Sequence, residues 1–121
     1  MEIRLKLEDV INIYLVTKDI VQDTEDFSLK FKLLGLMNTC EKHVINYDIL
    51  KNELFSKYGE EDEDGNISIN RKSSKAKLFM EETNKILSSE VTLQIDKIAI
   101  SKLNNRSAEE LLTLYPILSD E

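Results

Sequence analysis

The chain has 121 residues, of which 41% are hydrophobic and 32% are charged, and its formal net charge is −7. Chains of this length and composition fold around one hydrophobic core, so we expect a single domain that spans residues 1–121. The acidic balance argues against direct binding to nucleic acid, whose phosphates need clustered Lys and Arg, and favours a protein partner with a basic surface.

The cysteine content and the hydropathy pattern predict a compartment. Cys40 is the only cysteine, so the chain forms no internal disulfide and suits a reducing environment. Residues 1–6 alternate charged and apolar side chains, unlike the apolar centre of a signal peptide. No stretch approaches the ~20 apolar residues that cross a membrane. We therefore expect a cytoplasmic protein that does not bind a membrane.

The first two predicted elements are a strand and a helix. Residues 1–7 alternate apolar and charged side chains, which is typical of a half-buried strand, and we place it at the edge of a sheet. The next apolar residues recur at helical spacing, and two early carboxylates complement the dipole of a first turn. This pattern predicts a helix over residues 8–21. A polar connection follows, in which Asp26 or Ser28 caps the next helix.

The longest periodic signal predicts a helix over residues 28–58. Its apolar side chains recur every three or four residues, broken only by Lys51. Such a helix is about 45 Å long at ~1.5 Å per residue, so the shorter helix covers only its first half. The second half needs the C-terminal third of the chain or a second copy, so a homo-oligomer through the long helix is one expectation. The seam comprises Leu33, Met37, Cys40, Val44, Tyr47, Leu54 and Tyr58.

Shorter elements follow the long helix. Gly59 is a natural residue to end it, and Ile67 and Ile69 alternate in a short strand. Helical spacing resumes over residues 78–87 and predicts a third helix of about four turns. Residues 91–95 alternate again as a strand.

The C-terminal part completes the predicted fold. Ile98 and Ile100 extend the last strand beyond a kink. Ser107 and Glu110 form a capping box before a C-terminal helix that is interrupted near Pro116. The elements together predict an α+β fold: an antiparallel helical hairpin with one long helix, a small sheet of short strands and a C-terminal helix.

The most conspicuous stretch is an acidic run that precedes Gly65. On the template of a 12-residue calcium loop, Gly65 takes the sixth position, but the twelfth, which needs a bidentate glutamate, is the cation Arg71. We therefore expect a hydrated turn and no metal site, with the positive φ of the turn supplied at Gly65. The run is also our candidate interaction surface for a basic partner. It comprises Glu60, Glu61, Asp62, Glu63 and Asp64.

No residue set predicts catalysis, and none predicts a cofactor. Cys40 and His43 lie three residues apart on the long helix, but two ligands do not make a zinc site. Cys40 continues the apolar seam as a small core residue, and His43 is expected at the surface beside it. The glycine-rich and nucleophile motifs of nucleotide-binding and hydrolytic enzymes are absent. Neighbouring carboxylates such as Glu81 and Glu82 point about 100° apart on a helix and do not act as an acid–base pair without tertiary help.

A basic stretch follows the acidic run. Its members have no interleaved aromatic residue except Phe79, so a nucleic-acid surface is not expected. We expect the stretch to neutralise the acidic run or to cap a helix. It comprises Arg71, Lys72, Lys75 and Lys77.

The order of these parts resembles a group of small phage and prophage proteins of uncharacterised function. The shared features are a long helix that ends in KYGEEDEDGNISI, a helix with FMEETNKILSSEV, and a leucine-rich end with SAEELLTLYPIL. The segment between Gly65 and Phe79 is more basic here than in that group. The resemblance implies a phage origin and transfers no catalytic residue.

These observations predict a non-enzymatic phage protein that acts by protein–protein interaction in the host cytoplasm or in the virion. Its role would lie in particle assembly or in modulating a host or defence protein. Two alternatives stay open. One is an acidic mimic of nucleic acid that inhibits a protein with a basic groove, and the other is a small divalent-cation-dependent enzyme or sensor that uses residues 60–64.

Overall fold

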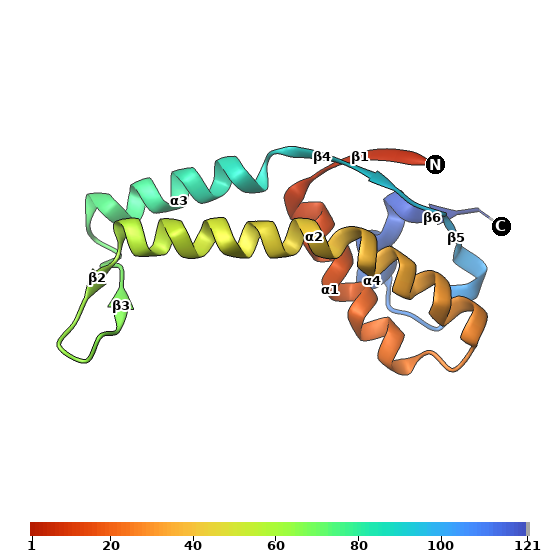
Figure 1. The fold of residues 1–121 in the computed structure, drawn as a ribbon. Helices are drawn as coiled ribbons and strands as arrows, with labels where there is room; N and C mark the ends of the chain where they lie inside the picture. The colour runs from red at the N-terminus through yellow and green to blue at the C-terminus, as the bar shows by residue number, and fades with distance from the viewer. Residues whose placement is uncertain (121) are drawn as a thin grey trace.

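The computed structural model describes residues 1–120, which form a head and an arm that projects from it (Figure 1). In the head, α1 (Leu7–Asp23) runs antiparallel to the first half of α2 (Phe27–Tyr58). The second half of α2 leaves the head, and α3 (Ser74–Leu87) returns beside it. We use arm for residues 44–88 and head for the rest of the described chain.

The remaining elements are short and complete the head, apart from one hairpin at the end of the arm. They are β1 (Glu2–Lys6), β2 (Glu60–Glu61), β3 (Ile67–Ser68), β4 (Glu90–Gln94), β5 (Ile98–Ala99), the 3-10 helix η1 (Ile100–Leu103), α4 (Ala108–Leu114), the 3-10 helix η2 (Tyr115–Ile117) and β6 (Leu118–Ser119).

The connection between α1 and α2 is short and ends in a side-chain cap. Asp26 is the N-cap of α2, and its carboxylate accepts hydrogen bonds from the backbone N–H groups of Ser28 and Leu29 at 2.9 and 3.4 Å. A capping carboxylate satisfies donors that the first helical turn leaves unpaired and complements the helix dipole. Asp26, one of the two predicted caps, therefore fixes where the hairpin turns.

The hydrophobic core lies in the head. It joins α1, the first half of α2, β4 and the C-terminal elements around side chains with almost no exposed surface. The buried hydrophobic residues are Leu7, Val10, Ile13, Ile20, Val21, Leu33, Leu36, Cys40, Leu93, Ile95, Ile98, Leu103, Leu114, Ile117 and Leu118. No described residue of the arm belongs to this set.

The strands form three separate two-stranded ladders. β1 pairs antiparallel with β4, which places Ile3 opposite Leu93 and Leu5 opposite Val91 on the side that faces the core. β5 pairs parallel with β6 in the head, and β2 pairs antiparallel with β3 at the end of the arm. A lone pair of strands is marginal in water, and β3 and β4 each contact α2.

A largely covered arginine links the C-terminal helix to the helical hairpin. Arg106 donates to Glu110 at 2.6 Å and to Asp23, the last residue of α1, at 3.2 Å. Its side chain is only 15% exposed. Ser107 and Glu110 form the capping box that starts α4, so the same glutamate serves both the cap and the ion pair.

The arm is held by partly buried contacts between two helices. The rings of Phe55 and Phe79 meet edge to face, with centroids 6.0 Å apart, and the Tyr58 hydroxyl donates to Glu82 at 3.4 Å. α3 contains no buried residue. The helix pair therefore forms a single layer, with one side of each helix against the other and the remaining sides in solvent.

The predicted fold is confirmed: the chain is α+β, with the helical hairpin, the long helix, short strands and the C-terminal helix that the sequence indicates. Two details differ. The strands make three ladders instead of one sheet, and the second half of α2 is covered by α3 of the same chain, which begins before the C-terminal third.

Candidate interaction surface

The acidic run forms the β2–β3 hairpin at the far end of the arm (Figure 1). α2 ends at Tyr58, as predicted, but Gly59 has an extended backbone with φ −83° and ψ 163°. Its lack of a side chain matters for space: a Cβ there would collide with Ile67 and lie 2.5 Å from the carbonyl oxygen of Phe55. The predicted helix end at Gly59 is therefore confirmed, and close packing of the hairpin on the helix end is the reason for the glycine.

Asp62 organises the turn of the hairpin. Its Oδ1 accepts hydrogen bonds from the backbone N–H groups of Asp64 and Asn66, each at 2.9 Å. Its own N–H donates to the Asn66 carbonyl at 2.8 Å. Gly65 has φ +83°, a conformation that other L-residues rarely adopt. The predicted turn and its glycine are confirmed.

The other carboxylates of the hairpin face solvent. Residues 60–68 are all exposed, and Glu60 forms a loose ion pair with Lys75 at 3.7 Å. That contact joins the acidic run to the basic stretch at the start of α3, as the sequence suggested. One ion pair between exposed groups offsets little of the negative charge. The hairpin thus presents concentrated negative charge about its tip.

The hairpin does not assemble a metal centre. Within residues 1–120, no three His, Cys, Asp or Glu side chains come together in a way that could hold a metal ion. The oxygen of Asp62 that would serve as a ligand is already bound by two amides. The divalent-cation alternative gains no support from this geometry.

Cys40 and His43 differ in their surroundings. Cys40 is fully buried in the core, and burial raises the pKa of its thiol to about 11, so the thiolate is scarce near neutral pH. The prediction of a core cysteine is confirmed. His43 is half-buried instead of lying at the surface, and its Nε2 is buried without a hydrogen-bond partner among the described residues. Burial and the nearby Lys42 lower the pKa of His43.

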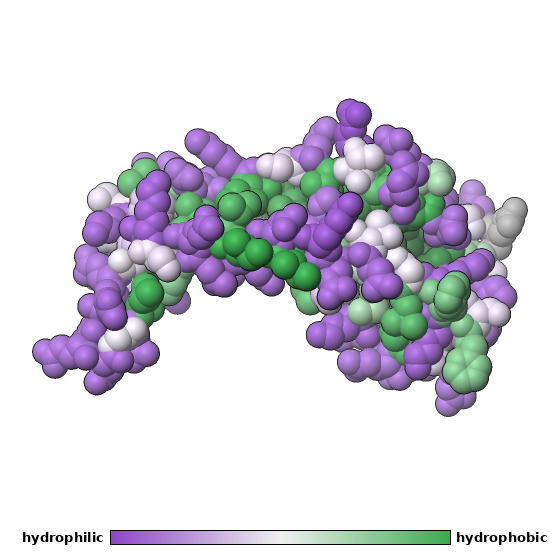
Figure 2. Space-filling view, in the orientation of Figure 1, coloured by the Kyte–Doolittle hydropathy of each residue, from purple (hydrophilic) through white to green (hydrophobic). Residues whose placement is uncertain are grey.

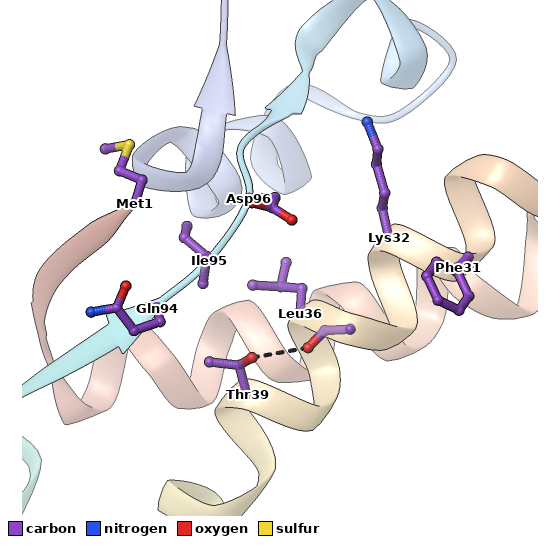
Figure 3. Close-up of a pocket in the computed structure, with 9 residues that line it drawn as sticks. Met1, Phe31, Lys32, Leu36, Thr39, Gln94, Ile95 and Asp96 are labelled. Carbon is purple, nitrogen blue, oxygen red and sulfur yellow. Dashed lines mark hydrogen bonds between the residues drawn. The ribbon is translucent and has the colours of Figure 1, made fainter.

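A hollow of about 450 Å³ lies where α2 passes the end of β4 (Figure 3). Leu36 and Ile95 form its apolar floor, while Lys32 and Asp96 stand at its rim. Thr39 closes one side and donates to the carbonyl oxygen of Gly35 at 3.0 Å. The full lining comprises Met1, Phe31, Lys32, Gly35, Leu36, Thr39, Gln94, Ile95 and Asp96. This mixed lining brings together no set of groups for acid–base or nucleophilic chemistry.

Sequence reasoning missed a second apolar face on α2. Phe31, Ile45 and Ile49 are 79, 49 and 52% exposed and lie opposite the packed seam. Figure 2 shows exposed hydrophobic surface over the middle of α2 and near its N-terminal end. The signal was present as a second set of apolar residues at helical spacing, which the stronger first seam obscured.

Comparisons with family models, curated proteins and solved structures gave no match. Within the described chain, no helix combines the length and the apolar character needed to cross a membrane. The geometry of the head, the arm and the hairpin is therefore the basis for a functional proposal.

Proposed function

We propose that this is a non-enzymatic protein of phage origin that acts by binding another protein through the end of its arm. The observation that carries the proposal is the placement of the hairpin. Its five carboxylates project at the tip of a helical arm, away from the core, on residues that are all exposed. The phage origin depends on the sequence resemblance alone.

The arm suits contact better than catalysis. It contributes no buried residue to the core, so the stability of the head does not account for it. Its length carries the charge clear of the head, where it can approach a partner with little steric hindrance. Concentrated charge of one sign guides association with an oppositely charged surface, so the expected partner is basic at the contact.

Two roles fit a contact of this kind in an infected cell. We propose that it acts in the host cytoplasm, either in particle assembly or by modulating a host or defence protein. In both cases the hairpin would bind a basic surface, and binding would weaken as salt screens the charges.

Affinity capture with charge variants tests the proposal. The hairpin variant carries Glu60→Gln, Glu61→Gln, Glu63→Gln and Asp64→Asn and keeps Asp62, which holds the turn. The control variant neutralises four exposed carboxylates of the head, Asp19, Glu25, Asp96 and Glu109. Both variants lose four negative charges from the same net charge of −7, so they differ only in the place of the loss.

We expect the wild-type protein and the head variant to capture the same partner from phage-infected cells and the hairpin variant to lose it. Purified partner should then bind with an affinity that falls as salt rises. Equal capture by all three proteins would contradict a role for the hairpin. Failure of the wild-type protein to capture any partner would contradict the proposed function as a whole.

A further inference from the structure

One edge of β4 is unpaired. Among the described residues, β1 is the only strand that pairs with β4. The backbone N–H of Ile95 donates to the carbonyl oxygen of Met1 at 2.9 Å. Since hydrogen-bonded and non-hydrogen-bonded pairs alternate along an antiparallel ladder, the backbone groups of Thr92 and Gln94 point away from β1. Each of these two residues therefore presents an N–H donor and a carbonyl acceptor at the open edge.

The open edge borders the hollow of Figure 3. In the head, β1 contacts α1 and β4 contacts α2, which places α2 on the open side of the ladder. Gln94, Ile95 and Asp96 line one wall of the hollow, and α2 forms the opposite wall. A strand edge, a helix and an apolar floor at Leu36 and Ile95 thus enclose a groove of about 450 Å³. We call it the edge groove.

Gly35 keeps the edge groove open. It lies in the wall that α2 contributes, and a Cβ there would meet nothing within 4 Å beyond its own helical turn. A glycine inside a helix costs about 1 kcal/mol relative to alanine, and no contact within the chain explains its presence. Glycine is typical of places where a ligand closely approaches the backbone. Its position in the wall across from β4 indicates that a ligand enters between the strand and the helix.

We propose that the edge groove binds an extended segment of a partner protein, which adds to β4 as a third strand. The unpaired backbone groups define this occupant, because an extended chain presents donors and acceptors at the spacing of a strand edge. A helix uses its backbone groups internally and could not pair with them. Alternate side chains of an added strand point to the same face, so the apolar floor takes a hydrophobic side chain of the segment.

The charges at the rim define the residues that flank this hydrophobic anchor. Lys32 and Asp96 are both exposed, and neither forms an ion pair with another described residue. An acidic residue of the segment can pair with Lys32, and a basic residue can pair with Asp96. Exposed charges of this kind contribute more to selectivity than to affinity. The expected segment therefore combines one large apolar residue with charged neighbours.

The edge groove lies on the head, away from the hairpin at the end of the arm, so this inference does not depend on the proposed function (Figure 1). Selection from a library of short random peptides tests it. The wild-type protein should enrich peptides that share one apolar position with charged neighbours, and these should bind with micromolar affinity. Recovery of no peptide above background would overturn the inference.

A matched pair of variants on α2 tests the place of binding. Gly35→Leu should weaken binding of a selected peptide by at least about tenfold, because the new side chain fills the groove while its own chain has room for it. Asn38→Leu adds a similar side chain at an exposed position of the same helix outside the groove, and it should leave the affinity unchanged. Equal binding by both variants, with the fold verified by circular dichroism, would overturn the assignment to the groove.

A second pair of variants tests the backbone pairing. Gln94→Pro removes the N–H that points away from β1 and should weaken binding about fivefold. Gln94→Ala keeps that N–H and should bind more tightly than Gln94→Pro. Affinity that falls for Gly35→Leu but is the same for both Gln94 variants would indicate a ligand that does not pair with β4, and it would overturn the strand addition.

Hydrogen exchange gives the same answer without a substitution. With a selected peptide bound, the amides of Thr92 and Gln94 should exchange more slowly, while those of Glu2 and Arg4 on the outer edge of β1 should not change. Protection of the β1 edge alone would overturn the assignment to β4. Sedimentation of the protein by itself tests the other occupant: self-association that Gly35→Leu abolishes would identify a second copy in the groove and overturn the assignment to a partner protein.

Discussion

The head and the arm share one helix but differ in how their side chains are covered. In the first half of α2, Leu33, Leu36 and Cys40 are buried against α1, β4 and the C-terminal elements. In the second half, the same stripe continues through Val44, Tyr47 and Leu54, where α2 packs against α3, and these side chains stay half-exposed. A side chain becomes buried only when neighbours cover it on several sides. In the arm, the two helices cover each other on one side only.

This difference teaches what each region contributes. Hydrophobic burial is the main stabilising term in folding and scales with apolar area removed from water. The head therefore supplies most of the stability of the chain. The arm depends on the head for its placement, and it supplies exposed surface: the hairpin at its tip and the apolar side chains of Ile45 and Ile49 along its side.

The strongest test of this comparison uses two leucines on the same stripe of α2. Leu33→Ala should lower the free energy of unfolding by about 3 kcal/mol, because Leu33 is fully buried and its removal leaves a cavity. Leu54→Ala should cost about 1 kcal/mol, because the half-exposed site can fill with water. Urea denaturation followed by circular dichroism measures both. Equal losses would mean that the arm is packed as firmly as the head.

A second test uses two glycines of α2 and its end. Gly59→Ala should destabilise the hairpin by about 2 kcal/mol, because the added methyl group meets Ile67 and the Phe55 carbonyl oxygen. Gly35→Ala should stabilise the helix by up to about 1 kcal/mol, because its site is open and alanine favours the helix. Hydrogen exchange should show faster exchange in residues 60–68 for the first variant alone.

The effect of Gly59→Ala should stay local. Global unfolding measured in the same sample should change little, since the head does not contact the hairpin. A large fall in global stability would show that the hairpin and the head unfold together, which the contrast between head and arm does not allow.

Much of the fold could be predicted because local signals and final structure agree. The caps at Asp26 and Ser107, the period of the long helix and the alternation of residues 91–95 each depend on neighbours in sequence. The hairpin could be placed for the same reason, since the turn at Gly65 follows from its own backbone.

The rest depends on contacts between distant segments. Strand pairing could not be predicted, because the alternation of two to five residues does not specify which strands pair. Three ladders form where one sheet was expected. The helix end at Gly59 was predictable, but the close approach of Ile67 that excludes a side chain there is a tertiary contact. The packing of α3 on the second half of α2 and the half-burial of His43 also depend on tertiary contacts, which spacing in sequence does not specify.

The smallest expected effect is the pH dependence of the ion pair between Arg106 and Glu110. Through this arginine, which also pairs with Asp23, α4 is linked to the end of α1. The hydrogen bond from Arg106 lowers the pKa of Glu110, and hydrogen bonds from Ser107 act in the same direction. A carboxylate with a lowered pKa in the folded state stabilises the protein above its ordinary pKa of 4.5 and loses that contribution as pH falls through this range. Glu110→Gln should cost about 1 kcal/mol at neutral pH.

The difference between the wild-type protein and Glu110→Gln should then shrink as pH falls from about 5 to 3, because the wild-type carboxyl becomes neutral as well. Urea denaturation at four pH values measures it. Glu109→Gln is the matched control, since Glu109 is exposed on the same helix. A difference that is constant with pH would mean that the charge of Glu110 does not contribute to stability. Side-chain packing would then hold α4 against the helical hairpin without help from the ion pair.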